Sequence, residues 1–140
     1  MLKQLSIYAE NKKGALQAMT NALYEAGINI WGSVTNDGAE YGINRMVVSD
    51  PDKAKEVLTE KGYLCRFVDV LAVEIEDKPG ALNTLLTALL DSNVNVDYTY
   101  LSFNRDSSTP VMILHTADPE EVEICLLSLI HISEPTRQEA

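Results

Sequence analysis

The chain has 140 residues, of which 46% are hydrophobic and 23% are charged, and its formal net charge is −10. These values are ordinary for a globular protein. No apolar run approaches the roughly 18 residues that a membrane-spanning helix needs, and the first residues do not form a signal-peptide pattern. We therefore expect a cytoplasmic protein without a membrane partner.

The negative charge is concentrated in the second half of the chain. Residues 1–68 contain eight Lys or Arg and eight Asp or Glu, whereas residues 69–126 contain two and eleven. An acidic surface does not suit a phosphate backbone, so we expect no nucleic-acid partner. The cysteines, Cys65 and Cys125, lie in apolar surroundings without the spacing of metal ligands. We expect them to be buried free thiols, with no metal site.

The first elements follow from periodicity and capping. Residues 4–9 alternate polar and apolar side chains, as a strand with one buried face does. Residues 15–26 place apolar side chains at helical spacing. Asp50-Pro51 supplies a capping side chain and a proline at the first helical position of a second helix. The predicted order is strand, helix, two hairpin strands, helix and strand, at residues 4–9, 15–26, 28–35, 41–49, 51–61 and 63–68.

The same order of elements then starts again. Asp118-Pro119 begins a helix just as Asp50-Pro51 does, and a polar turn at 104–109 separates two hairpin strands. The predicted strands are 71–75, 94–103 and 111–116, and the predicted helices are 81–89 and the segment from 119 onward. His115 lies in an apolar strand without a partnered catalytic motif, so we interpret it as a satisfied strand histidine.

The repetition is an internal duplication. Gly14 corresponds to Gly80 and Asn29 to Asn95, each 66 residues apart, and the Asp-Pro pairs are 68 apart. Units of under 70 residues bury only about 60% of their unfolded surface, so we expect the two to pack together. Each unit reads βαββαβ, the ferredoxin-like order, which gives an α+β fold with antiparallel sheets and helices on one face.

The end of the chain is a separate case. Residues 127–137 resemble the in-frame translation of a sequencing adapter. We therefore expect unit 1 at 1–68, unit 2 at 69–126, and a non-native tail at 127–140. Under this interpretation the second unit lacks its native last strand.

The loop of the second unit carries a resemblance to a known family. Asp77-Lys78-Pro79-Gly80-Ala81-Leu82, after a strand and before an amphipathic helix, is similar to the D-x-P-G-x-L loop of the ACT domain. An apolar-Asn-apolar triplet follows at the expected distance, as Val94-Asn95-Val96. In the first unit Asn11 and Lys13 stand in place of Asp77 and Pro79, so the second copy fits the pattern better. The whole chain resembles stand-alone tandem ACT proteins.

The resemblance implies an amino-acid site where two domains pair, with the loop of one unit facing the second strand of the other. Amide groups at a helix start and the helix dipole suit a carboxylate, an Asn amide offers both donor and acceptor, and Asp77 could pair with an α-ammonium group. The alternative, a helix-start turn with nothing bound, stays open. The candidate ligand-binding residues are Asn11, Gly14, Ala15, Leu16, Asn29, Ile30, Asp77, Gly80, Ala81, Leu82, Asn95 and Val96.

The functional hypothesis is a non-catalytic regulatory protein that binds a free amino acid or a similar small ligand. The chain has no phosphate-binding glycine loop, zinc motif or nucleophile elbow, so we expect neither an enzyme nor a cofactor. We expect a homo-oligomer, such as a dimer. The alternative is a ligand-independent dimerisation or protein-interaction module, or a regulatory subunit of an enzyme of amino-acid metabolism.

Overall fold

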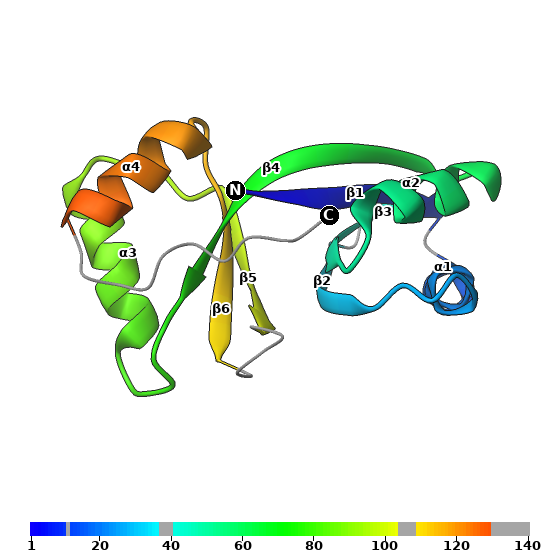
Figure 1. Ribbon diagram of the computed structural model, residues 1–140, viewed down its shortest axis with the longest axis horizontal. Helices are drawn as coiled ribbons and strands as arrows, with labels where there is room; N and C mark the ends of the chain where they lie inside the picture. The colour runs from blue at the N-terminus through cyan, green and yellow to red at the C-terminus, as the bar shows by residue number, and fades with distance from the viewer. Residues whose placement is uncertain (11, 37–40, 104–108, 130–140) are drawn as a thin grey trace. The chain divides into compact units, whose positions relative to one another are not determined.

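Ten elements make up the described part of the chain in the computed structural model, which covers residues 1–10, 12–36, 41–103 and 109–129: six strands and four helices. Contacts divide these residues into two units (Figure 1). The amino-terminal unit contains residues 3–68. The carboxy-terminal unit contains residues 1–2 and the described residues from 69 onward.

The amino-terminal unit has the order predicted from periodicity. Its strands lie side by side as β2-β3-β1 and pair antiparallel, with Met46 of β3 opposite both Leu5 of β1 and Ser33 of β2. The elements are β1 (Leu2–Glu10), α1 (Ala15–Glu25), β2 (Ile30–Asn36), β3 (Tyr41–Val48), α2 (Pro51–Glu60) and the start of β4 (Leu64–Glu74).

One face of this sheet carries both helices. Leu5 and Ile7 are two residues apart on β1 and fully buried, so they point to the same face. Met19 and Leu23, four residues apart on α1, and Leu58 of α2 complete the core. The helical and strand periods of the sequence meet in one apolar layer, which confirms helices on one face.

The carboxy-terminal unit repeats this arrangement. Its strands lie in the order β4-β6-β5 and pair antiparallel, and α3 and α4 lie on the same side of β5 and β6 (Figure 1). Leu71, Leu85, Leu114 and Val122 bring strands and helices into one core. The elements after β4 are α3 (Ala81–Asp91), β5 (Tyr98–Phe103), β6 (Pro110–His115) and α4 (Pro119–Leu129).

Three predicted strands differ from the structure. The strands expected at 63–68 and 71–75 form one continuous strand, β4, because no turn residue interrupts them. The strand expected from residue 94 begins only at Tyr98. Asn93, just before this segment, has a positive φ of 59°, and Val94 and Val96 pack against the core of the carboxy-terminal unit from an irregular segment.

Several predicted features lie outside the described residues. These are Asn11, residues 37–40 between the two hairpin strands of the first unit, most of the turn at 104–109, and the residues after 129, where we expect the second unit to lack its native last strand. Helix α4 continues to Leu129, three residues into the segment expected to be non-native. The assignment of that tail stays a prediction.

Candidate functional site

Both predicted loops end on a glycine that caps a helix. Gly14 precedes α1 with φ 84° and Gly80 precedes α3 with φ 85°, a left-handed conformation in which an L side chain is strained. A Cβ atom at either position would meet no heavy atom within 4 Å. The backbone angle alone therefore requires glycine, and the space next to each loop is open.

The two loops share one hydrogen-bond pattern, shifted by 66 residues. The Lys12 N–H donates to the Glu10 carbonyl (3.0 Å) and the Lys78 N–H to the Glu76 carbonyl (3.0 Å). The Ala15 N–H donates to the Lys12 carbonyl (3.1 Å). The corresponding Ala81 N–H donates to the Lys78 carbonyl (3.3 Å). A tight turn at each helix start is thus encoded twice.

The next two backbone N–H groups of each helix have no hydrogen-bond acceptor among the described residues. Helices α1 and α3 have neither a side-chain cap nor an acidic residue in the first turn. Within the described part of the chain, the N–H groups of Leu16 and Gln17 have no acceptor, and those of Leu82 and Asn83 have none either. Four donors at the positive ends of two helix dipoles are available to an anion.

A cavity lies beside each loop. The cavity in the amino-terminal unit has a volume of about 810 Å³, and Gly14 and Ala15 line it together with the segment that follows α2. The cavity in the carboxy-terminal unit has a volume of about 510 Å³, and Asp77 and Ala81 line it together with Pro110. Both volumes fall in the range of small-molecule sites.

The charges around the two cavities differ. Lys12, Lys13 and Lys61 line the amino-terminal cavity against a single acid, Glu10. Three acids and one base, Lys78, line the carboxy-terminal cavity. A carboxylate is therefore better accommodated by the amino-terminal loop, although the carboxy-terminal loop fits the sequence pattern better.

Each loop also holds one ion pair at its surface. The Lys12 ammonium lies 3.2 Å from the Glu10 carboxylate, and the Lys78 ammonium lies 2.7 Å from the Glu76 carboxylate. The hydrogen bond and the charge of Lys78 lower the pKa of Glu76 below its ordinary value. Because all four side chains are more than half exposed, these pairs are solvated and contribute little to stability.

The predicted asparagines lie far from the loops of their own units. The strand register places Glu10 beside Tyr41 and Ile30 beside Val48, and the Ser49 N–H donates to the Asn29 carbonyl (2.9 Å). Eight residues of strand separate Tyr41 from Ser49, which is roughly 25 Å. In the second unit Asn95 precedes β5, opposite the end where Ile75 donates to Pro110. No unit brings its own loop and asparagine together.

The remaining candidate residues are divided between core and surface. Ile30 packs against the core of the amino-terminal unit and Val96 against that of the carboxy-terminal unit. Leu16 and Leu82 are 47% and 37% exposed. Asn11 lies outside the described residues.

Comparison with known proteins settles the family. The family described as an ACT domain pair matches residues 1–136. The chain belongs to this family. The two ferredoxin-like units, each with its own loop, are therefore the two halves of an ACT pair, as the sequence predicted.

Solved structures show the same fold. Protein BT0572 from Bacteroides thetaiotaomicron is 31% identical, with a TM-score of 0.82, and the match covers 90% of this chain and 86% of that one. The regulatory subunit of aspartate kinase from Thermus thermophilus, in a ligand-free form, is 14% identical (TM-score 0.64, 92% of each chain). That from Thermus flavus is 17% identical (TM-score 0.60, 94% and 92%). A search of curated proteins found no match.

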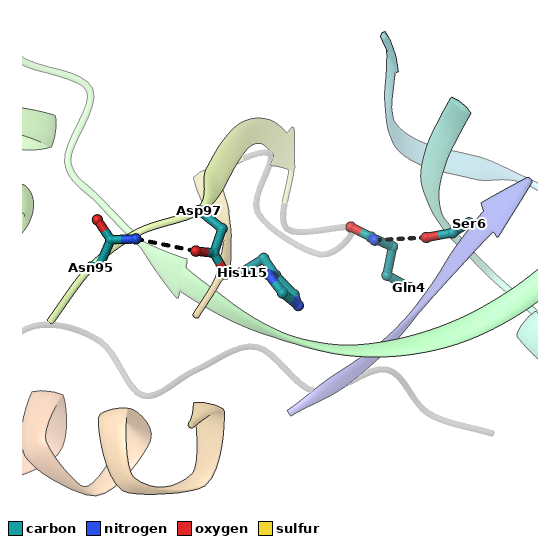
Figure 2. Close-up of polar contacts among 5 residues, drawn as sticks. All are labelled: Gln4, Ser6, Asn95, Asp97 and His115. Atoms are coloured by element: carbon teal, nitrogen blue, oxygen red, sulfur yellow. Dashed lines mark hydrogen bonds and ion pairs between the residues drawn. The ribbon is translucent and has the colours of Figure 1, made fainter. Parts of the chain in front are cut away.

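The ACT pair also holds a polar cluster that the sequence analysis missed. Near the start of β5, the Asn95 amide donates to Asp97 (3.2 Å), and His115 Nδ1 lies 2.8 Å from the other Asp97 oxygen. Figure 2 shows these three side chains and also the Gln4–Ser6 hydrogen bond of β1 (3.2 Å), which belongs to the amino-terminal unit. The His115 ring stacks on Tyr98, its neighbour across the strands (4.8 Å). His115 is a satisfied strand histidine, as predicted. Its partners, Asp97 and Tyr98, come from the neighbouring strand and the segment before it, so no local sequence motif predicts them.

Within the described residues of this ACT pair, no helix is long and apolar enough to cross a membrane. The same residues contain no cluster of three or more His, Cys, Asp or Glu side chains suited to a metal ion.

Proposed function

We propose that this ACT pair is a non-catalytic regulatory protein that binds a free amino acid or a similar small carboxylate. The observation that carries the proposal is the pair of uncapped helix starts, each with two unused amides. Each start adjoins a cavity that its first helical residue, Ala15 or Ala81, lines. By contrast, α2 has the Asp50 side chain as its cap. The likeness to aspartate kinase regulatory subunits supports a regulatory role.

In this proposal the ligand carboxylate accepts hydrogen bonds from the first-turn amides of α1. The surrounding lysines, Lys12, Lys13 and Lys61, add a favourable field. The carboxy-terminal loop is the weaker carboxylate site, because Asp77 and its acidic neighbours repel an anion. Asp77 is instead suited to an α-ammonium group.

A thermal-shift screen of the twenty amino acids on the full chain tests the proposal. A ligand that binds only the folded state at 100 times its Kd adds about 2.7 kcal/mol of stability, so the melting temperature rises. We expect one amino acid or a chemically related group of them to raise it. The absence of a shift at millimolar concentration of any of the twenty would count against ligand binding.

A ligand-independent interaction module is the second candidate, and exposed apolar side chains favour it. Leu101 and Phe103, two residues apart on β5, are 50% and 54% exposed. Light scattering with and without the twenty amino acids separates the two functions. An oligomer that no amino acid changes, together with a flat thermal screen, would favour this candidate.

A further inference from the structure

A third cavity lies in the carboxy-terminal unit, away from its loop. It has a volume of about 450 Å³ and is lined by the end of α3, the irregular segment before β5 and the start of α4. We call this place the α3–α4 corner. Its lining includes the polar residues Ser92, Asn95, Asp97, Thr116, Asp118 and Glu121.

The buried hydroxyl group of Thr116 has no partner. The residue is only 2% exposed, and within the described part of the chain its Oγ1 atom has no hydrogen-bond partner. Thr116 continues the alternation of Met112 and Leu114, whose side chains lie in the core beneath the helices, so it faces the helix layer, where the cavity lies. Buried hydroxyl groups nearly always have a partner, and a ligand in the cavity would supply one.

The charges that line the corner are all negative. Asp97, Asp118 and Glu121 contribute carboxylates, and no Lys or Arg is among the lining residues that the structure describes. Glu120 and Glu121 both belong to the first turn of α4, where an acid complements the helix dipole. Only Glu121 lines the cavity, so the two residues separate a helix effect from a ligand effect.

The amino-terminal unit shows how a related corner is filled. There the Lys53 ammonium, on the first turn of α2, donates to the Ala26 carbonyl at the end of α1 (2.9 Å). The internal repeat places Glu121 at the position of Lys53, Thr116 at that of Val48, and Ser92 at that of Ala26. The second unit has therefore lost a cation from this corner and gained a carboxylate and a hydroxyl group.

We propose that the α3–α4 corner binds a primary alkylammonium ligand, whose ammonium group takes the place of the Lys53 ammonium. It would donate to Thr116 Oγ1 and the Ser92 carbonyl and pair with Glu121. The alkyl chain would lie against Val122. The cavity is large enough for a small organic molecule, and the described residues offer no metal-binding cluster. The site is separate from the loops, so it goes beyond the function proposed above.

Nuclear magnetic resonance titration of the full chain tests this proposal. We expect n-butylammonium and 1,5-diaminopentane to shift the amide signals of Ser92, Thr116 and Glu121, and not those of Ala81 and Leu82 at the loop. Tetramethylammonium has the same charge but no N–H donor, so it should shift them much less. No change at the corner with either amine, or an equal response to tetramethylammonium, would overturn the proposal.

Two variants and a matched control sharpen the test. Glu121→Gln should weaken amine binding about tenfold, the loss of one charge-assisted hydrogen bond, whereas Glu120→Gln should leave it unchanged. Thr116→Val restores the residue of the first unit and should weaken binding while keeping the fold. Equal affinities of Glu121→Gln and Glu120→Gln would refute the assignment. If a variant does not fold, the wild-type comparison with tetramethylammonium still decides.

Free lysine and simple amines share the alkylammonium group, and the titration separates them. Lysine that shifts the corner while n-butylammonium does not would contradict recognition through the alkylammonium group alone. Binding at the corner that survives a failed amino-acid screen would leave this proposal standing and remove the proposed function. An amino acid that raises the melting temperature, together with no amine binding at the corner, would remove this proposal and leave the proposed function standing.

Discussion

At the scale of single residues, backbone angle explains more than ligand contact does. Gly14 and Gly80 are both left-handed, and open space surrounds both. Both glycines are candidate ligand-binding residues, yet the turn requires glycine with or without a ligand. A substitution at these positions therefore reports on stability first.

Gly80→Ala should destabilise the protein by about 1 kcal/mol, because an alanine pays roughly 1–2 kcal/mol in the left-handed region. Gly80→Asn should cost less, since asparagine tolerates this conformation. Gly14→Ala is the matched variant in the other unit and should behave like Gly80→Ala. Urea unfolding of the three variants measures the effect. An alanine variant as stable as the wild type would show that the turn is not held in this conformation.

The thiol of Cys65 should be unreactive in the folded protein. Burial raises its pKa, and the opposing effects of Lys55 and the Thr59 hydrogen bond are smaller. A raised pKa keeps the thiol protonated, so its contribution to stability holds below the ordinary thiol pKa and is lost as the pH rises through the folded value. At neutral pH, iodoacetamide followed by mass spectrometry should label Cys65 far more slowly than in the denatured chain. Equal rates in both states would disprove the burial.

At the scale of elements, an adjacent Asp-Pro pair predicted the start of a helix correctly. Asp50-Pro51 marks the start of α2, and the Asp50 carboxylate accepts from the Lys53 N–H (3.1 Å). Asp118-Pro119 likewise marks the start of α4, and apolar periodicity located α1 and α3. It failed at residues 94–97, because Val94 and Val96 alternate like strand residues but pack on the core from an irregular segment that follows the left-handed Asn93. Alternation reports which side chains are buried, and a strand is only one way to bury them.

The cap of α2 should be worth about 1 kcal/mol, the usual cost of replacing an N-cap aspartate by alanine. We expect Asp50→Ala to lower the free energy of unfolding by that amount. Asp52→Ala removes an acid from the same turn that makes only an exposed ion pair with Lys3 (3.3 Å), so its effect should be smaller. Denaturant unfolding compares them, and a larger loss for Asp52→Ala would argue against the capping role.

At the scale of the whole molecule, the duplication was visible in the sequence, and the consequences of its divergence were not. The 66-residue spacing predicted two units of one fold, and the structure and the family match confirm them. The difference in charge between the two cavities became visible only because folding brings Lys61 to the cavity that Lys12 and Lys13 also line. The α3–α4 corner likewise depends on Thr116 and Glu121, which no motif connects.

The predicted ligand site combines residues that lie far apart within each unit. Sequence reasoning joined loop and asparagine into one site through the family resemblance. Within each unit the strand register separates them by most of the length of a strand. A composite site that draws the loop from one unit and the asparagine from another copy or unit stays a prediction.

Isothermal titration calorimetry on matched loop variants tests the central claim most directly. Gln17→Glu and Asn83→Asp each place a carboxylate on the unused amides of the first turn, which complements the helix dipole and so leaves the fold intact. The amino acid found in the thermal screen should bind Gln17→Glu about tenfold or more weakly than the wild type, since the added charge repels its carboxylate and occupies its donors. Asn83→Asp should weaken binding less. Unchanged affinity in both variants would contradict carboxylate recognition at these helix starts.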